Sequence, residues 1–183
     1  DYMCDELLRH IARKMQCICT DPNIIKCNDD AITKLIEKQT TIIFEGAQGV
    51  LLDKDKGFLP HVSATDTSTY LAEEFLQRIN YKGYVHKMGI IRSYVTRHGA
   101  GPLPSEIKGL KIPGENNEYN EWQQDFRVGT FDKSLIKKAL EICPIDSIFI
   151  TCLDNDPFKR DDHYLHYAKQ LAEMIEIPLS GIS

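Results

Sequence analysis

The segment TIIFEGAQGVLLDKDKG, residues 41–57, gives the clearest indication of the fold. Its apolar run at residues 42–44 leads directly into a loop of glycines and carboxylates. A second apolar run, residues 88–91, also leads into a loop rich in glycine and polar side chains. Short β-rich runs that end in such loops are how α/β proteins place a ligand at the carboxyl ends of parallel strands. We therefore predict that both runs are strands and that the loops after them hold the ligand site.

The remaining segments alternate between helical and extended patterns. We expect helices at residues 2–19, 31–38, 67–79, 131–142 and 163–175, strands at 41–44, 84–96 and 147–153, and mostly loop at 99–119. The segment 84–96 is one strand, or two strands with a bend at Gly89. This order predicts an α/β fold with a mixed, largely parallel sheet flanked by helices. A length of 183 residues predicts a single domain, residues 1–183.

Composition excludes several classes of protein. The formal net charge of −5 leaves no basic excess for binding nucleic acid. No apolar run approaches the roughly 20 residues that span a membrane, and no signal-peptide pattern is present. The six cysteines, at positions 4, 17, 19, 27, 143 and 152, form no Cys-x-x-Cys pair that would indicate zinc or redox chemistry. Scattered thiols of this kind are typical of a reducing cytoplasm, where we expect the protein to reside.

The loop after the first apolar run offers groups that suit a purine. Gly46 and Gly49 permit positive φ angles and a close approach of the backbone to a ligand. Gln48 presents an amide donor and acceptor together, which matches a purine edge with an oxo group beside a ring nitrogen. A glutamine that merely caps a turn is the simpler alternative reading of Gln48 taken alone.

Three blocks, taken together, carry a specific resemblance. FEGAQGVLLD at residues 44–53, PHVSATDTS at 60–68 and TRHGAGPLPSE at 96–106 resemble adenylosuccinate synthetase in order and spacing. The resemblance covers the middle two thirds of the chain and continues weakly to Asp154. It implies part of a P-loop-NTPase-like synthetase fold. The family's N-terminal phosphate loop, general base, catalytic histidine and C-terminal end have no match here, so we expect an internal piece that is inactive alone.

The resemblance also implies an activity and its partners. The family joins L-aspartate to C6 of a purine nucleoside monophosphate, converting IMP to adenylosuccinate in purine biosynthesis. Hydrolysis of a nucleoside triphosphate, GTP in the family, drives this ligation with Mg²⁺ through a 6-phosphoryl intermediate. The resemblance implies a homodimer with small-molecule substrates only, without nucleic-acid or membrane partners.

The matching positions imply roles for individual residues on the substrate side. Gln48 would stabilise charge on the purine 6-oxygen, with Gly46 and Gly49 beside it. Ser63, Thr65 and Arg97 would bind the nucleoside monophosphate, although the hydroxyl-rich segment would also cap a helix in any case. Arg127 would grip the carboxylates of aspartate through its planar fork.

The triphosphate side departs from the family pattern. Asp154 would accept hydrogen bonds from the guanine of GTP, while the family's lysine is replaced by Cys152. The triphosphate is therefore GTP or ATP, with Lys159 and Arg160 as possible substitutes for the lysine. A turn or cap role is the alternative for Asp154.

Other interpretations stay open at this stage. Asp53 and Asp55 are a solvated pair, or they orient Gln48 or bind a cation. His98, where the family usually has an apolar residue, is treated as a bystander. The chain is alternatively part of a divergent synthetase for a guanine or deoxy nucleotide, or a catalytically silent nucleotide-binding module.

Overall fold

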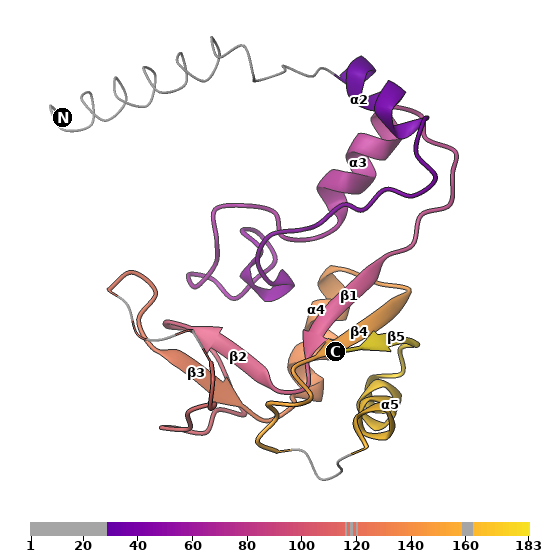
Figure 1. Cartoon of the computed structure of the whole chain (residues 1–183). Helices are drawn as coiled ribbons and strands as arrows, with labels where there is room; N and C mark the ends of the chain where they lie inside the picture. The colour runs from indigo at the N-terminus through magenta and orange to yellow at the C-terminus, as the bar shows by residue number, and fades with distance from the viewer. Residues whose placement is uncertain (1–28, 116, 118, 120, 159–162) are drawn as a thin grey trace, which may run out of the picture. The chain divides into compact units, whose positions relative to one another are not determined.

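The computed structural model describes residues 29–115, 117, 119, 121–158 and 163–183 (Figure 1). The chain divides into two compact units, Asp1–Phe44 and Glu45–Ser183, each of which is described by itself. The helix expected at residues 2–19 lies outside the described residues, as do four of the six cysteines, Lys159 and Arg160. The expectation of a single domain stays a prediction.

The first unit contributes one described helix, α2, Asp29–Ile36, close to the expected 31–38. The prediction of a buried strand at residues 41–44 is wrong, because these described residues form no strand and Ile42, Ile43 and Phe44 are exposed. A strand needs a neighbour for its backbone N–H and C=O groups, and the strands of the described residues all lie further along the chain.

The described residues of the second unit form a 3₁₀ turn, three α-helices and five strands. In chain order they are η1 Val50–Leu52, α3 Tyr70–Arg78, β1 Met88–Arg92, β2 Val95–His98, β3 Phe126–Gly129, α4 Lys133–Ile142, β4 Ser147–Thr151, α5 Tyr164–Ile175 and β5 Leu179–Ile182. β1, β4 and β5 form a parallel sheet in the order β1-β4-β5, and β2 pairs antiparallel with β3. The predicted α/β fold with a mixed, largely parallel sheet is confirmed.

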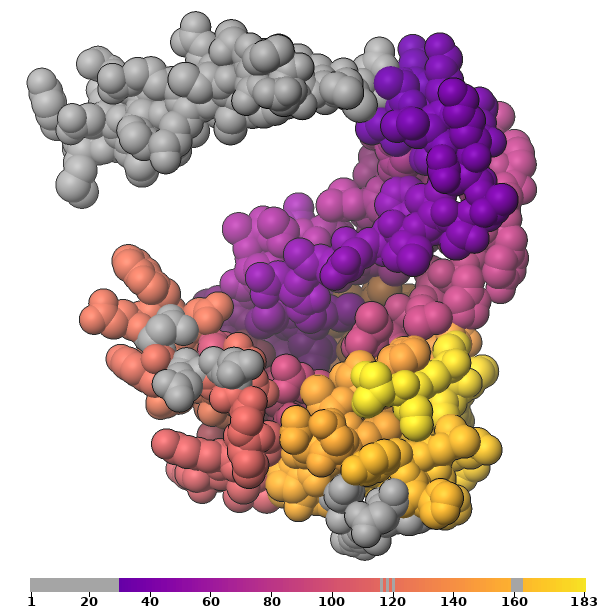
Figure 2. Space-filling view, viewed as in Figure 1, coloured from indigo at the N-terminus to yellow at the C-terminus, as the bar shows by residue number. Residues whose placement is uncertain are grey.

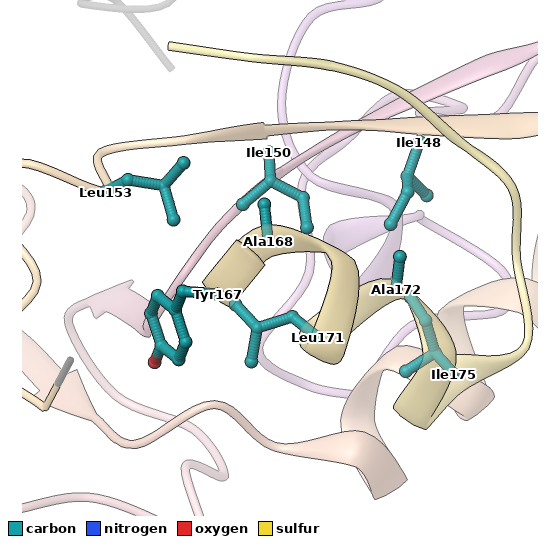
Figure 3. Packing of buried hydrophobic residues seen from close by; sticks show 8 residues of the cluster. All are labelled: Ile148, Ile150, Leu153, Tyr167, Ala168, Leu171, Ala172 and Ile175. Atoms are coloured by element: carbon teal, nitrogen blue, oxygen red, sulfur yellow. The ribbon is translucent and has the colours of Figure 1, made fainter. Parts of the chain in front are cut away.

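The main core forms where α5 packs on the parallel sheet. Ile148 and Ile150 of β4 point toward the helix face that carries Ala168 and Ala172 (Figure 3). The buried residues of α5 recur at intervals of three and four, which places them on one side of the helix; they are Tyr167, Ala168, Leu171, Ala172 and Ile175. Ile136 of α4 packs against the same cluster, so both helices lie on this face of the sheet.

The other face of β1 is open among the described residues. Because side chains alternate along a strand, Met88 and Ile90 point away from Ile91, which packs against the main core. Met88 is 47% exposed and Ile90 is 71% exposed. β1 is also an edge strand of the described sheet.

Several boundaries differ from expectation. The chain turns between β1 and β2 at Ser93 and Tyr94 rather than at Gly89, because Tyr94 is buried in a second cluster with Ile112 and Val128. Helix α3 begins later than expected, after Thr69, and contains no buried residue. Leu71 of this helix is 57% exposed.

The second cluster joins the β2–β3 pair to the end of β4. Cys152 and Phe158 pack against Tyr94, Ile112 and Val128. In Figure 2 the salmon surface of the β3 region accordingly adjoins the orange surface of the β4 region. None of the described helices is long and apolar enough to cross a membrane.

Candidate functional site

The loop between residue 44 and η1 places Gln48 in a left-handed conformation. Gln48 has φ 70° and is exposed. The positive φ expected of the glycines thus falls on the glutamine, since Gly49 has φ −90°. A Cβ at Gly46 or Gly49 would meet no atom within 4 Å, so the space beside both glycines is open. Left-handed backbone at a residue other than glycine costs roughly 1 kcal/mol, and such strain clusters at functional sites.

The hydroxyl-rich segment is hydrogen-bonded to η1. Ser63 donates to Leu52 O from its backbone N, at 2.7 Å, and from its Oγ, at 2.9 Å. The Ser63 and Thr65 hydroxyls lie 3.2 Å apart, and Thr67 Oγ1 lies 3.4 Å from Val50 O. The first two blocks of the resemblance therefore form one local structure, with the predicted phosphate-contacting hydroxyls side by side.

Asp53 holds this local structure together rather than binding a cation. It is 1% exposed, and its carboxylate accepts the backbone N–H groups of Asp55, Lys56 and Thr67 at 3.0, 2.9 and 3.1 Å. Burial, the largest influence, raises the pKa of Asp53, but these three N–H groups together bring it below its ordinary value. Asp55 is exposed beside Lys54. Of the two carboxylates that could form a solvated pair, Asp55 is therefore at the surface and Asp53 is buried.

Replacing Asp53 by Asn is expected to lower the free energy of unfolding by about 1–3 kcal/mol, because an amide NH₂ cannot accept the buried Thr67 N–H. Asp55→Asn, at an exposed position, is the matched control and should change stability little. Urea unfolding at several pH values would measure both variants.

The pH dependence provides a second check on Asp53. Its folded pKa is lowered, so its contribution is present above the unfolded pKa of about 3.9 and is lost as the pH falls through the folded value. Asp53→Asn should not show this part of the decrease in unfolding free energy at acid pH. Equal stability of the two variants at neutral pH would contradict the role given to Asp53.

Two arginines face each other across the β2–β3 pair and bind the same loop. Arg97 and Arg127 are register partners. Arg97 Nε donates to Ala100 O at 2.8 Å, while Arg127 Nη1 donates to Gly99 O and Gly101 O at 2.9 and 2.8 Å. Three successive carbonyls of the third block are thus held by guanidinium groups, which fixes the loop.

Each arginine also has a partner outside this loop. Arg97 Nη2 donates to His61 O at 2.9 Å, which connects the third block to the second. Burial and then the nearby Arg127 charge lower the pKa of Arg97. Arg127 forms a two-pronged ion pair with Glu106, whose pKa it lowers through that hydrogen bond. The donors of Arg127 are thus engaged within the chain, and its contact with an amino-acid carboxylate stays a prediction.

The end of β4 places Cys152 and Asp154 differently. Cys152 has φ 61°, and it packs with Tyr94 in the second cluster. Its carbonyl accepts from Ser93 Oγ at 3.2 Å. Asp154 is exposed and makes no hydrogen bond or ion pair with the described residues. Among the two residues predicted to contact a triphosphate base, only the carboxylate of Asp154 is thus presented to solvent.

Sequence reasoning missed a cluster around Arg92, the last residue of β1. Its guanidinium lies 5.8 Å from the ring centroid of Tyr94 and 5.9 Å from that of Phe126. Its Nη1 donates to Glu115 at 2.9 Å. A charged residue that directly follows the apolar run 88–91 was the available signal, since it marks the carboxyl end of a parallel strand.

The described residues contain no group of three or more His, Cys, Asp or Glu side chains that could hold a metal ion. The carboxylate of Asp53, a cation-binding candidate in the sequence, accepts three backbone N–H groups.

Taken together, hydrogen bonds connect the predicted substrate segments. Leu52 binds Ser63, His61 binds Arg97, and Arg97 lies opposite Arg127. An exposed amide, two hydroxyls and a guanidinium thus come from neighbouring loops, which suits a ligand with an oxo-purine and a phosphate. Cys152 is joined to Ser93 by a hydrogen bond and packs in the second cluster.

Comparison with known proteins gives a consistent result. The family model described as adenylosuccinate synthetase matches residues 3–158. The adenylosuccinate synthetase of Thermoplasma volcanium is 39% identical over 133 residues, 69% of this chain and 30% of that protein. That of Mesoplasma florum is 36% identical over 140 residues, 72% of this chain and 32% of the relative. The chain thus spans about a third of the length of these relatives.

Two solved structures share the fold. Fully ligated adenylosuccinate synthetase from Plasmodium falciparum aligns with a TM-score of 0.63 and 16% identity, over 85% of this chain and 50% of that one. The succinoaminodeoxyadenylate synthetase of cyanophage S-2L, bound to dGMP and to dATP as an energy donor, aligns with a TM-score of 0.61 and 17% identity, over 86% and 47%.

Proposed function

The chain belongs to the adenylosuccinate synthetase family, and from this premise we propose that it forms part of a ligase of purine nucleotide biosynthesis. The whole protein would join L-aspartate to C6 of a purine nucleoside monophosphate. The observation that carries the proposal is the meeting of the three matching blocks, through Leu52–Ser63 and His61–Arg97. Blocks that only shared sequence by chance would have no reason to converge on one site.

The reaction has two steps in this proposal. The purine 6-oxygen attacks the γ-phosphorus of a nucleoside triphosphate, which releases the diphosphate and leaves a 6-phosphoryl intermediate. The amine of aspartate then attacks C6, and inorganic phosphate leaves with the oxygen. Phosphorylation makes a poor leaving oxygen into a good one, so positioning and electrostatics supply most of the catalysis.

Each residue then has a role in this scheme. The exposed amide of Gln48 stabilises charge on the 6-oxygen, beside the open space at Gly46 and Gly49. Ser63, Thr65 and Arg97 bind the monophosphate, and Arg127 positions the amino acid or the loop that receives it. Mg²⁺ would neutralise charge on the triphosphate. A homodimer and a cytoplasmic location, both implied by the sequence resemblance, stay predictions.

A divergent synthetase acting on a guanine or deoxy nucleotide is the second candidate. Cys152 supports it, since that side chain packs into an apolar cluster instead of offering a lysine to a base. The cyanophage structure of the same fold binds dGMP and dATP. We include dGMP and dATP among the substrates to be tested for this reason.

The deciding experiment measures phosphate release and the succinyl-purine product by the intact protein. IMP, GMP and dGMP are each supplied with aspartate and with GTP, ATP or dATP. Aspartate-dependent product with one of the three supports a synthetase and identifies its nucleotide. Nucleotide binding without product would instead favour a catalytically silent binding module.

Asp154→Asn is expected to lower affinity for GTP about tenfold and to leave ATP nearly unchanged. A carboxylate accepts from the two donors of guanine, whereas adenine offers an acceptor at N1 and no amino group at C2. Because cysteine is too short to pack across the base as the family's lysine does, we expect the starting preference for GTP over ATP to be modest. Nucleotide titrations of both proteins would measure it, with Asn155→Ala, the exposed neighbour, as control. If Asp154→Asn keeps a strong preference for GTP, Asp154 does not contact the base.

A further inference from the structure

His98 joins the segments on which the two substrate sites are predicted. It ends β2, and its ring packs edge to face on Phe126, its register partner in β3, with centroids 5.0 Å apart. Its Nδ1 lies 3.0 Å from Gln123 Oε1. The backbone N of Gly99 donates to Asp125 O at 3.0 Å. The chain just before β3 is therefore fastened to the loop that follows Arg97.

The contact with Gln123 suits one tautomer of the neutral ring. Where Nδ1–H donates to the Oε1 carbonyl oxygen of Gln123, Nε2 carries the lone pair. Nε2 is shielded from solvent and has no hydrogen-bond partner among the described residues. A buried acceptor without a partner is costly to the folded protein and calls for an explanation.

We propose that His98 Nε2 accepts a hydrogen bond from an N–H or O–H group of a bound substrate. The proposal rests on the proposed function, which places a nucleotide near Arg97 and an amino acid near Arg127. The proposed substrates carry two candidate donors: the amino group of the amino acid and a sugar hydroxyl of the nucleotide. Family members usually have an apolar residue here, so the acceptor would be a specificity feature of this chain.

Two substitutions separate the two ring nitrogens. His98→Asn keeps a polar group near Nδ1, which can still meet Gln123, and removes Nε2. His98→Gln places an amide oxygen near Nε2 and removes the Nδ1 contact. We expect His98→Asn to raise KM for one substrate about tenfold at nearly constant kcat. His98→Gln should bring KM most of the way back to that of the unchanged protein. Both variants should unfold at a similar denaturant midpoint.

A spectroscopic readout tests the contact without turnover. In ¹⁵N-histidine-labelled intact protein, Nε2 should resonate as an unprotonated nitrogen and shift when its donor binds. Three ligands are added in separate experiments: aspartate, a ribonucleoside monophosphate and its 2′-deoxy form. A shift with aspartate assigns the amino group, a shift with only the ribonucleotide assigns the 2′-hydroxyl, and a shift with both nucleotides assigns another nucleotide donor.

Other outcomes overturn the inference and distinguish it from the proposed function. If a nucleotide shifts the backbone amides of Ser63 and Thr65, aspartate is also supplied, and Nε2 stays unchanged, the inference is wrong while the proposed function stands. A similar KM for His98→Asn and the unchanged protein would also overturn it. If no purine nucleotide binds at all, both proposals are lost together.

Discussion

Gln48→Ala in the intact protein is expected to lower kcat about 10²–10³-fold while KM for the monophosphate changes little. Removal of one preorganised donor to a developing oxyanion typically has an effect of this size. The charge on the purine 6-oxygen grows as the phosphoryl group is transferred, so the amide acts mainly in the transition state. Gln48 is exposed in open surroundings, so truncation removes no packing contact that the fold depends on.

A second variant controls for the left-handed backbone conformation at Gln48. Gln48 has φ 70°, and alanine would keep the same left-handed cost. Asn80, with φ 55°, has a similar conformation at an exposed position after α3. Asn80→Ala should therefore match Gln48→Ala in stability and retain full activity. Steady-state kinetics with varied monophosphate would settle the assignment, and a raised KM at unchanged kcat would place Gln48 in ground-state binding only.

Gly101→Ala is expected to lower kcat/KM about 100-fold by displacing Arg97. Gly101 has φ 117°, and a Cβ there would lie 2.3 Å from Arg97 Nη2 and 2.5 Å from its Cζ. The guanidinium is held by Ala100 O and His61 O, so moving it breaks the bonds that join two blocks of the site. A misplacement of about 1 Å in a positioning group is enough for a loss of this size.

Gly109→Ala separates this steric effect from backbone strain. Gly109 has φ 75°, but a Cβ there would meet nothing within 4 Å. We expect a loss of about 1–2 kcal/mol in unfolding free energy from left-handed backbone at Gly109, with activity retained. Gly101→Ala should lose stability as well and, unlike the control, most of its affinity for the monophosphate. Normal monophosphate affinity in Gly101→Ala would show that Arg97 does not bind that substrate.

Sequence periodicity predicted the helices better than the strands. Residues 131–142 and 163–175 contain α4 and α5 because their apolar residues recur on one helix face, and Asp132 caps α4 through the N–H groups of Ser134 and Leu135. β3 and β5 were missed because four-residue strands carry little pattern. The run at residues 42–44 looked equally extended, but strand formation depends on a pairing partner that local sequence does not encode.

The site residues named from the sequence stay a prediction, and their contacts could not be read from the sequence. Asp53 and Asp55 appear equivalent in sequence, yet only Asp53 lies where three backbone N–H groups converge. The resemblance gave Arg127 a substrate role and could not anticipate its ion pair with Glu106, because Glu106 reaches β3 only through its bridge with Gly129. Tertiary hydrogen bonding decides such roles, and spacing along the chain does not report it.

The open side of β1 has a consequence for the colloidal behaviour of the isolated chain. Met88 and Ile90 present an apolar surface beside an edge of β1 that no strand of the described residues pairs with. Such an edge can recruit a strand from another molecule, and repetition of that event leads to aggregates. A net charge of −5 offers only modest mutual repulsion against it. Solubility of this stretch should therefore depend on whether β1 is covered, even where the site itself is correctly folded.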